Sequence, residues 1–181
     1  FRERILRMTP HRTLEAGRNE QITADLQGVI EDTVGVEGSS PYLVFPGLIQ
    51  KGLAADPVTL KGVNWSDENR LFEIERLLEA GELARMLGVR IGDGVTIVTP
   101  LHSAPLAVDG LFYTGYYPLD AGLVLLPLEM LQDLTETTGL TGYGVKVSNF
   151  SDVDSYILPL QSKTNLWVRA WYEREQSLFI G

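Results

Sequence analysis

The sequence predicts an α+β fold in which a mostly-β region is inserted into a domain made of two strand–helix–strand units. An amphipathic helix between two strand-like segments is expected within the first fifty residues, and the pattern returns after Thr138. Short strands and turn glycines fill the residues between them. Joined units of this kind usually form a small ferredoxin-like sheet. We therefore expect one discontinuous subdomain from residues 1–51 and 139–181, and an inserted subdomain from residues 52–138.

The helix expected over residues 20–32 has the clearest pattern of the N-terminal part. Its apolar residues follow the 3.6-residue period of one helix face: Ile22, Leu26, Val29 and Ile30. Residues 1–8 are predicted to form a shorter helix that Pro10 ends, with Phe1, Ile5 and Met8 on one face. A short strand is expected over residues 11–16, and the apolar run at 42–45 predicts another.

The inserted region is expected to alternate short strands and short helices. Alternation predicts a half-buried strand over residues 58–63, and a helix capped by Ser66 or Asp67 follows it. Helical spacing continues over residues 71–78 and 83–87. Three strands, at 95–98, 107–113 and 122–126, are expected to form an antiparallel group, and Pro127 suits the first turn of the next helix.

The C-terminal part repeats the strand–helix–strand order. A strand is predicted over residues 144–147, and a helix over 152–160 is expected to be capped by Ser151 or Asp152. Pro159 should interrupt or end that helix. A strand over residues 166–171 and a further helix over 173–180 complete the pattern.

Composition excludes several classes of function. The 181 residues carry a formal net charge of −9 and no basic stripe, which argues against nucleic acid as a partner. The absence of cysteine removes disulfides, thiol catalysis and cysteine-based zinc sites. Apolar runs fall far short of the roughly 18 residues that a membrane-spanning helix needs. The chain begins at Phe1 and ends at Gly181 in mid-pattern, so we expect it to be a part of a longer protein.

No residue pattern predicts catalysis, a cofactor or a metal ion. Gly88, Gly92 and Gly94 stand between a helix and a strand, whereas a dinucleotide site needs the order strand, glycines, helix. We therefore interpret them as a helix C-cap and a turn. The two histidines, His11 and His102, have no ligand spacing around them, and the carboxylates are scattered along expected solvated faces.

Aromatic residues gather in two places. One group lies at residues 112–117, and the other includes Trp167 and Trp171 near the C-terminal end. Core packing explains both groups. A second hypothesis is that the chain ends lie close to a membrane interface, where tryptophan and tyrosine are favoured. On that hypothesis the membrane-proximal residues are Phe1, Ile5, Trp171 and Phe179.

Several motifs together resemble a known family. Residues 1–11 (FRERILRMTPH) look like the segment that follows the first transmembrane helix of the LolC/LolE family, the permease subunits of the lipoprotein-releasing ABC transporter. Residues 83–100 (LARMLGVRIGDGVTIVTP) are similar to the family's central motif, and residues 108–112, 116–120 and 126–129 continue it. Residues 171–179 (WYEREQSLF) resemble the lead into the second transmembrane helix. The resemblance spans the whole chain.

This resemblance implies a periplasmic domain on the inner membrane, with a porter subdomain of two β-α-β units and an inserted sabre subdomain. It implies no enzymatic activity and no cofactor, since a separate LolD-like subunit hydrolyses ATP. The implied partners are a paralogous LolC-like permease subunit, outer-membrane lipoproteins and a periplasmic lipoprotein chaperone. A related mechanotransmission permease of the MacB/FtsX type, serving efflux or activating cell-wall hydrolases, is the alternative. A hydrolase using the scattered carboxylates is a third hypothesis.

One departure from the family pattern affects the expected partners. LolC-type chains carry a long hairpin, the hook that captures the chaperone, after the Thr-Pro end of the central strand. Here only residues 101–104 separate Pro100 from Pro105, so the hook is missing and the chain looks LolE-like. No chaperone-binding residue is carried over. If a cargo-lining face exists, the apolar residues Tyr42, Val44 and Phe45 are our candidates, with core packing as the alternative.

Overall fold

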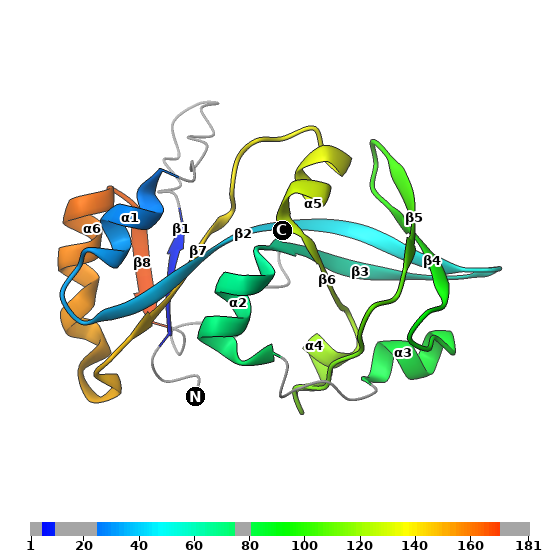
Figure 1. Ribbon diagram of the computed structural model, residues 1–181, viewed down its shortest axis with the longest axis horizontal. Coiled ribbons are helices and arrows are strands. Elements are labelled where there is room, and N and C mark those ends of the chain that lie inside the picture. The colour runs from blue at the N-terminus through cyan, green and yellow to red at the C-terminus, as the bar shows by residue number, and fades with distance from the viewer. Residues whose placement is uncertain (1–4, 10–24, 75–80, 171–181) are drawn as a thin grey trace. The chain divides into compact units, whose positions relative to one another are not determined.

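The computed structural model describes residues 5–9, 25–74 and 81–170, which form two compact units (Figure 1). Unit 1 comprises Phe1–Tyr42 and Thr138–Gly181, and unit 2 is Leu43–Thr137. The α+β class predicted from the sequence is confirmed, and the strands pair in both parallel and antiparallel directions. Each unit has its own buried residues.

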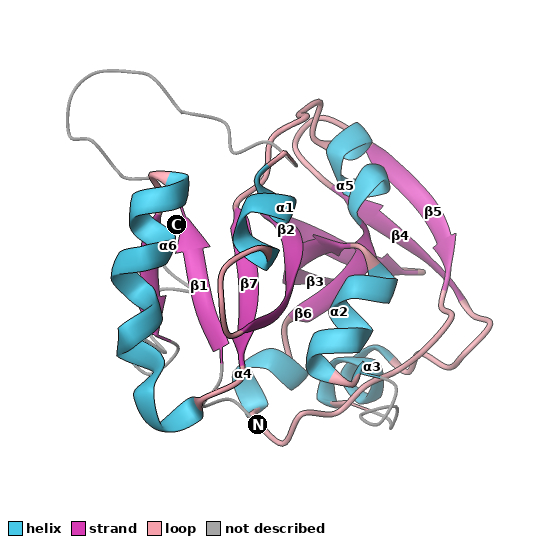
Figure 2. Ribbon diagram, turned by 60° about the vertical axis from the view of Figure 1, so that its left-hand side comes forward, coloured by secondary structure: helices cyan, strands magenta, loops and turns pink. Residues whose placement is uncertain are grey.

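In the described part of unit 1, four antiparallel strands lie in the order β2-β7-β1-β8. Their bounds are β1 Ile5–Thr9, β2 Val36–Lys51, β7 Gly142–Val147 and β8 Trp167–Ala170. Figure 2 shows β1 and β7 side by side. Tyr143 of β7 lies opposite Met8 on one side and Pro41 on the other. The strands predicted at 144–147 and 166–171 are confirmed within one or two residues, for the residues that the structure describes.

The helix predicted over residues 1–8 is wrong, because residues 5–9 form strand β1. This strand hydrogen-bonds to β7 on one side and to β8 on the other. Two complete ladders of backbone hydrogen bonds outweigh the weak helical spacing of three apolar residues. The predicted strand at 11–16 and the predicted helix at 173–180 lie outside the described residues.

Two helices of unit 1 pack against each other, α1 (Leu26–Glu31) and α6 (Ile157–Thr164). The first confirms the described part of the helix expected over residues 20–32. A 3₁₀ helix, η3 (Phe150–Tyr156), precedes α6 and is capped by the side chain of Asn149, not by Ser151 or Asp152. Pro159 does not end the helix as predicted. It lies in the first turn of α6, where the missing N–H of proline costs no hydrogen bond.

Unit 2 is built on the distal half of β2. A tight turn at Gly52 leads from it into β3 (Ala54–Val63), which pairs with β2. On its other side β3 pairs in parallel with β6 (Leu123–Pro127). Strand β4 (Gly94–Val98) pairs antiparallel with both β2 and β5 (Ser103–Ala107). The predicted antiparallel group of strands 95–98, 107–113 and 122–126 is therefore wrong, since β4 pairs with β5 at 103–107 and β6 is parallel to β3.

The boundaries of several other elements of unit 2 differ from the prediction. Strand β5 ends at Ala107, so the strand expected over 107–113 is wrong. Helix α2 (Trp65–Phe72) is capped by Asn64, whose side chain accepts a hydrogen bond from the N–H of Asp67. The remaining helices are α3 (Glu82–Leu87), α4 (Tyr117–Asp120) and α5 (Leu128–Leu134). The helix expected over 71–78 is wrong at its start, because Leu71 and Phe72 end α2 and Glu73 is left-handed, and residues 75–78 are not described.

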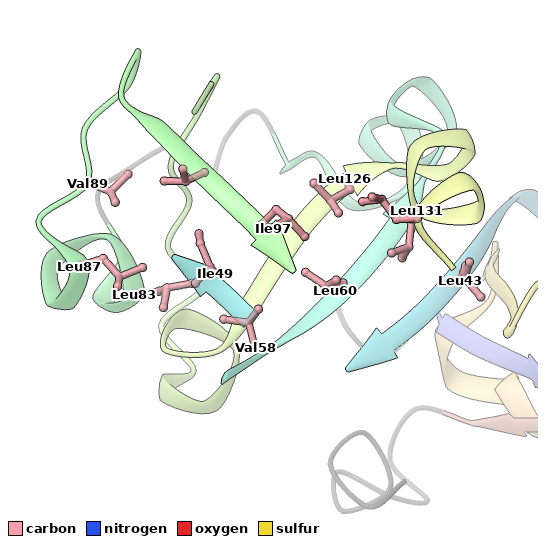
Figure 3. Packing of buried hydrophobic residues seen from close by; sticks show 12 residues of the cluster. Leu43, Ile49, Val58, Leu60, Leu83, Leu87, Val89, Ile97, Leu126 and Leu131 are labelled. Carbon is pink, nitrogen blue, oxygen red and sulfur yellow. The ribbon is translucent and has the colours of Figure 1, made fainter. Parts of the chain in front are cut away.

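The core of unit 2 lies between its strands and α5 (Figure 3). Leu60, Ile97 and Leu131 are its most deeply buried members, with exposed fractions of 0 to 1%. Burial of each such side chain contributes roughly 1.5–3 kcal/mol to stability. Gly62 of β3 allows α5 to approach closely, because a Cβ atom there would lie 3.0 Å from Cβ of Leu131.

Candidate functional site

A mostly apolar cavity of about 720 Å³ lies within unit 2. Strands β2, β4, β5 and β6 and helix α3 contribute to its walls, together with the connections that flank β5 and α4. Strand alternation explains which residues face it. On β4, Val95 and Ile97 are buried while the intervening residues are half-buried or exposed.

Helix α3 supplies part of the apolar wall. Leu83 and Leu87 are one helical turn apart, so both project from the same side of the helix, toward Ile49 of β2 in Figure 3. Gly88 ends this helix in the left-handed conformation, with φ of 61°, and Val89 then packs beside Leu87. A single helical turn and its glycine cap thus place three apolar side chains along the cavity.

Asp120, at the end of α4, is a buried carboxylate among the cavity-lining residues. Its Oδ1 atom accepts hydrogen bonds from the backbone N–H of Thr114 at 2.7 Å and from the Thr114 hydroxyl at 2.8 Å. Its Oδ2 atom has no hydrogen-bond partner among the described residues. Buried polar atoms are almost always hydrogen-bonded, so this oxygen is an unsatisfied acceptor inside a largely apolar site.

The glycine-rich segment after α3 forms a turn, as predicted. Gly92 has φ of 89°, which favours glycine, and its N–H donates to the carbonyl oxygen of Val108. Asp93 Oδ2 accepts from Lys51 Nζ at 2.6 Å and from the N–H of Arg90 at 2.9 Å. The Lys51 ammonium, with a smaller contribution from Arg90 N–H, holds the pKa of Asp93 below its ordinary value. These bonds fix the turn.

The connection between β4 and β5 is short and tightly closed. The N–H of Thr99 donates to the carbonyl oxygen of His102 at 2.8 Å, and the N–H of His102 bonds to the Thr99 hydroxyl at 3.0 Å. The same hydroxyl lies 2.8 Å from the carbonyl oxygen of Leu134 in α5. His102 also reaches Glu136, with 2.8 Å between Nε2 and Oε1. Residues 99–102 therefore make a compact turn at the position where the sequence analysis placed the missing hook.

The three candidate cargo-lining residues do not share one face. Tyr42 and Val44 point to one side of β2 and Phe45 to the other, because side chains alternate along a strand. Tyr42 is buried, with 8% of its surface exposed, and Phe45 packs against the core of unit 2. Val44 is half-buried. Core packing, the alternative to a cargo-lining role, thus accounts for the position of Phe45.

The hypothesis of membrane-proximal ends concerns residues that are mostly outside the described part. Phe1, Trp171 and Phe179 are not described, and Ile5 is the first residue of β1. In the described ranges no helix has the length and apolar character needed to cross a bilayer. Within the same ranges, no three His, Asp or Glu side chains gather in a way that could hold a metal ion.

Sequence reasoning missed Asp120 and the cavity. Asp120 was part of the motif that carried the family resemblance, but no charge pattern distinguished it from the other carboxylates of the chain. The available signal was its position after Tyr116-Tyr117-Pro118, where a short helix in an apolar region would tend to bury it. Its burial depends on the loop around Thr114, a contact that periodicity does not show.

Comparison with curated proteins finds distant relatives of one kind. The chain is 27% identical over 174 residues to the lipoprotein-releasing system transmembrane protein LolC of Xylella fastidiosa (strain Temecula1), which covers 81% of this chain and 42% of the relative. It is 23% identical over 212 residues to LolC of Neisseria meningitidis serogroup B, covering 99% of this chain and 51% of the relative. The chain thus spans about half the length of these relatives or less. No family model matches it.

Solved structures with the same fold come from other transporters. The periplasmic region of MacB from Actinobacillus actinomycetemcomitans superposes with a TM-score of 0.65 at 13% identity, over 97% of this chain and 92% of that one. The extracellular domain of the noncanonic ABC-type transporter YknZ from Gram-positive bacteria superposes with a TM-score of 0.62 at 15% identity, over 91% and 98%. At such identities the likeness establishes the fold. The curated relatives are of the kind that the sequence motifs resemble.

Proposed function

Because the chain is a distant homologue of LolC-like permeases with the fold of a MacB periplasmic region, we propose that it is the periplasmic domain of a lipoprotein-releasing permease. In this proposal it is a non-catalytic part of an inner-membrane protein that helps to release outer-membrane lipoproteins and pass them to a periplasmic chaperone. Its partners are a paralogous permease subunit and a cytoplasmic ATPase. The similarity to LolC over 99% of the chain is the observation that carries the proposal.

The two units support a division into porter and sabre subdomains. Unit 1 contains two β-α-β segments, β1-α1-β2 and β7-α6-β8, whose strands interleave in one antiparallel sheet. This strand order is the one expected of a ferredoxin-like porter. Unit 2, a single continuous segment of the chain, corresponds to the inserted sabre.

The ends of β1 and β8 support attachment to the membrane at one edge of unit 1. The two strands are antiparallel, and Leu6 near the start of β1 lies opposite Ala170 at the end of β8. Chain entering at Ile5 and leaving after Ala170 therefore does so at the same end of the sheet. This is the geometry required if Phe1, Ile5, Trp171 and Phe179 lie close to the bilayer between two transmembrane helices.

Depletion of the full-length protein in its native cell tests this function. We expect outer-membrane lipoproteins to accumulate in the inner membrane, measured by membrane fractionation and blotting. Re-expression of the intact gene should restore the normal distribution, and a version lacking residues 43–137 should not. An unchanged lipoprotein distribution after full depletion would reject the proposal.

The cargo-lining role of Tyr42, Val44 and Phe45 is a separate proposal with its own test. Val44 is the best position for a photo-crosslinking residue because it is half-buried on the β2 face opposite Phe45. We expect irradiation during transport to trap a lipoprotein at position 44 and not at Val34, which is 92% exposed in unit 1. Equal trapping at both positions, or none at position 44, would eliminate this role.

The alternative function is that of a MacB/FtsX-type mechanotransmission permease. The fold likeness to MacB and the compact β4–β5 turn favour it, since LolC-type proteins are expected to carry a hook there. The Neisseria alignment spans 212 positions, 31 more than the 181 residues of this chain, so that relative carries extra residues within the aligned region. Crosslinking of the full-length protein to a periplasmic efflux adaptor or a hydrolase activator, without any lipoprotein adduct, would favour this alternative.

A further inference from the structure

The cavity of unit 2 has the size and the surface of a small-molecule site. Its volume of about 720 Å³ falls within the usual range for ligand pockets. Its walls are mostly apolar, so water inside it finds few hydrogen-bond partners. An occupant with an apolar body would replace that water with apolar contacts.

The charged residues that line the cavity indicate which head group the occupant would carry. Of the described residues that line it, the only charged ones are Asp109, which is exposed, and Asp120, which is buried. No lysine, arginine or histidine is among these lining residues. Among the described lining residues an anionic head group would meet two carboxylates, whereas a cationic head group would be attracted by both.

The unsatisfied atom of Asp120 identifies where the head group would bind. Thr114 donates two hydrogen bonds to Oδ1, so that half of the carboxylate is already occupied by the protein. Oδ2 lacks a donor among the described residues and is itself covered, so a head group reaches it only by displacing the side chains that cover it. A buried acceptor left without a donor is destabilising, and a hydrogen bond between charged groups is stronger than one between neutral groups. An ammonium group would supply both the donor and the opposite charge.

We propose that the unit 2 cavity binds a cationic amphiphile, with its aliphatic chain against the apolar walls and its ammonium group hydrogen-bonded to Asp120 Oδ2. The site is contained within residues 43–137. It does not depend on the proposed role in lipoprotein release, since it requires neither a lipoprotein nor a partner subunit.

Three probes with one chain length and different head groups test the proposal on the 181-residue chain. Decylammonium, decanol and decanoate are titrated at neutral pH below their critical micelle concentrations, with binding measured by calorimetry. Trp65 lines the cavity, so its fluorescence in a Trp167→Phe, Trp171→Phe background reports occupancy independently. We expect decylammonium to bind at least tenfold more tightly than decanoate, with decanol between them. Equal affinity for the three head groups, or no binding of decylammonium, would overturn the proposal.

Variants locate the site. Asp120→Asn keeps the acceptor for Thr114 and removes the charge, so it should abolish the preference for decylammonium over decanol. Glu129→Gln removes one charge from an exposed position outside the cavity and should leave all affinities unchanged. Leu106→Trp fills part of the cavity and should weaken the binding of decylammonium and of decanol tenfold or more. Circular dichroism establishes that each variant is folded. Decylammonium binding that survives both Asp120→Asn and Leu106→Trp would place the ligand elsewhere and reject the site.

Discussion

Tyr143 is expected to make the stability of unit 1 fall as the pH rises into the alkaline range. The side chain is fully buried in β7, and burial, with a smaller effect of the nearby Asp25 charge, raises its pKa to about 12 from 10.0. A tyrosine with a raised pKa in the folded state contributes stability that is fully present below pH 10. This contribution is lost as the pH rises from 10 to 12, and it amounts to up to about 3 kcal/mol.

Tyr143→Phe tests this linkage. The variant cannot ionise at this position, so its free energy of unfolding should fall less steeply between pH 10 and pH 12 than that of the wild type. The measurement is urea unfolding at a series of pH values, comparing slopes and not absolute stabilities. Tyr117→Phe, at a side chain that is 65% exposed, is the control. Identical slopes for Tyr143→Phe and wild type would contradict the prediction.

Thr99, a residue with only 6% of its surface exposed, joins the β4–β5 turn to α5 through its hydroxyl. Thr99→Val keeps the shape of the side chain but removes the hydrogen bonds to His102 and Leu134. We expect a loss of about 1–3 kcal/mol, the cost of leaving buried backbone groups without partners. Thr99→Ser, which keeps the hydroxyl, should retain most of the stability in chemical denaturation. A Val variant as stable as wild type would mean that the turn is held by other contacts.

At the scale of elements, the sequence predicted what depends on local pattern and missed what depends on pairing. Helix α3 ends at Gly88 as predicted, because a left-handed C-cap is encoded by glycine itself. Strand β1 was predicted as a helix, since its place between β7 and β8 follows from partners more than 130 residues away in the chain. Register and direction likewise belong to pairs of strands, so β6 was expected to be antiparallel and is parallel to β3.

The candidate site was less predictable than the fold for the same reason. The helix at 83–87 and the strand at 95–98 were predicted, but the cavity between them is a property of several elements together. Asp120 is one acidic residue among many in the sequence. Its unsatisfied oxygen appears only when α4 and the loop at Thr114 have folded around it.

Gly47 tests the close packing of β2 on its neighbours in unit 2. A Cβ atom there would lie 2.6 Å from Cδ1 of Leu60 and 2.9 Å from the backbone oxygen of Val98. The leucine can move, but the backbone of β4 cannot move without breaking its pairing with β2. We expect Gly47→Ala to destabilise the chain by about 1–3 kcal/mol in urea unfolding. Gly94→Ala is the matched control, because a Cβ atom at that position meets nothing within 4 Å. Equal stability of the two variants would show that the strands accommodate the extra methyl group.

At the scale of the whole chain, each unit has a core of its own. Leu60 belongs to the core of unit 2, whereas Leu160 of α6 is buried in unit 1, and neither has any exposed surface. The units also have separate natural reporters, with Trp65 at the start of α2 and Trp167 at the start of β8. Matched truncations can therefore be followed from within each unit.

We expect Leu60→Ala and Leu160→Ala to act on different unfolding transitions. Each removes a fully buried leucine and should cost about 2–5 kcal/mol in the unit that contains it. In a Trp167→Phe, Trp171→Phe background only Trp65 remains, and Leu60→Ala should lower the denaturant midpoint of its fluorescence transition. In a Trp65→Phe, Trp171→Phe background only Trp167 remains, and Leu160→Ala should lower the midpoint of that transition. If either truncation moved both reporters equally, the chain would unfold as one cooperative body, and a ligand bound in unit 2 would raise both transitions. Separate shifts would mean that ligand binding in the unit 2 cavity raises only the Trp65 transition, since a ligand stabilises the folded state that holds it.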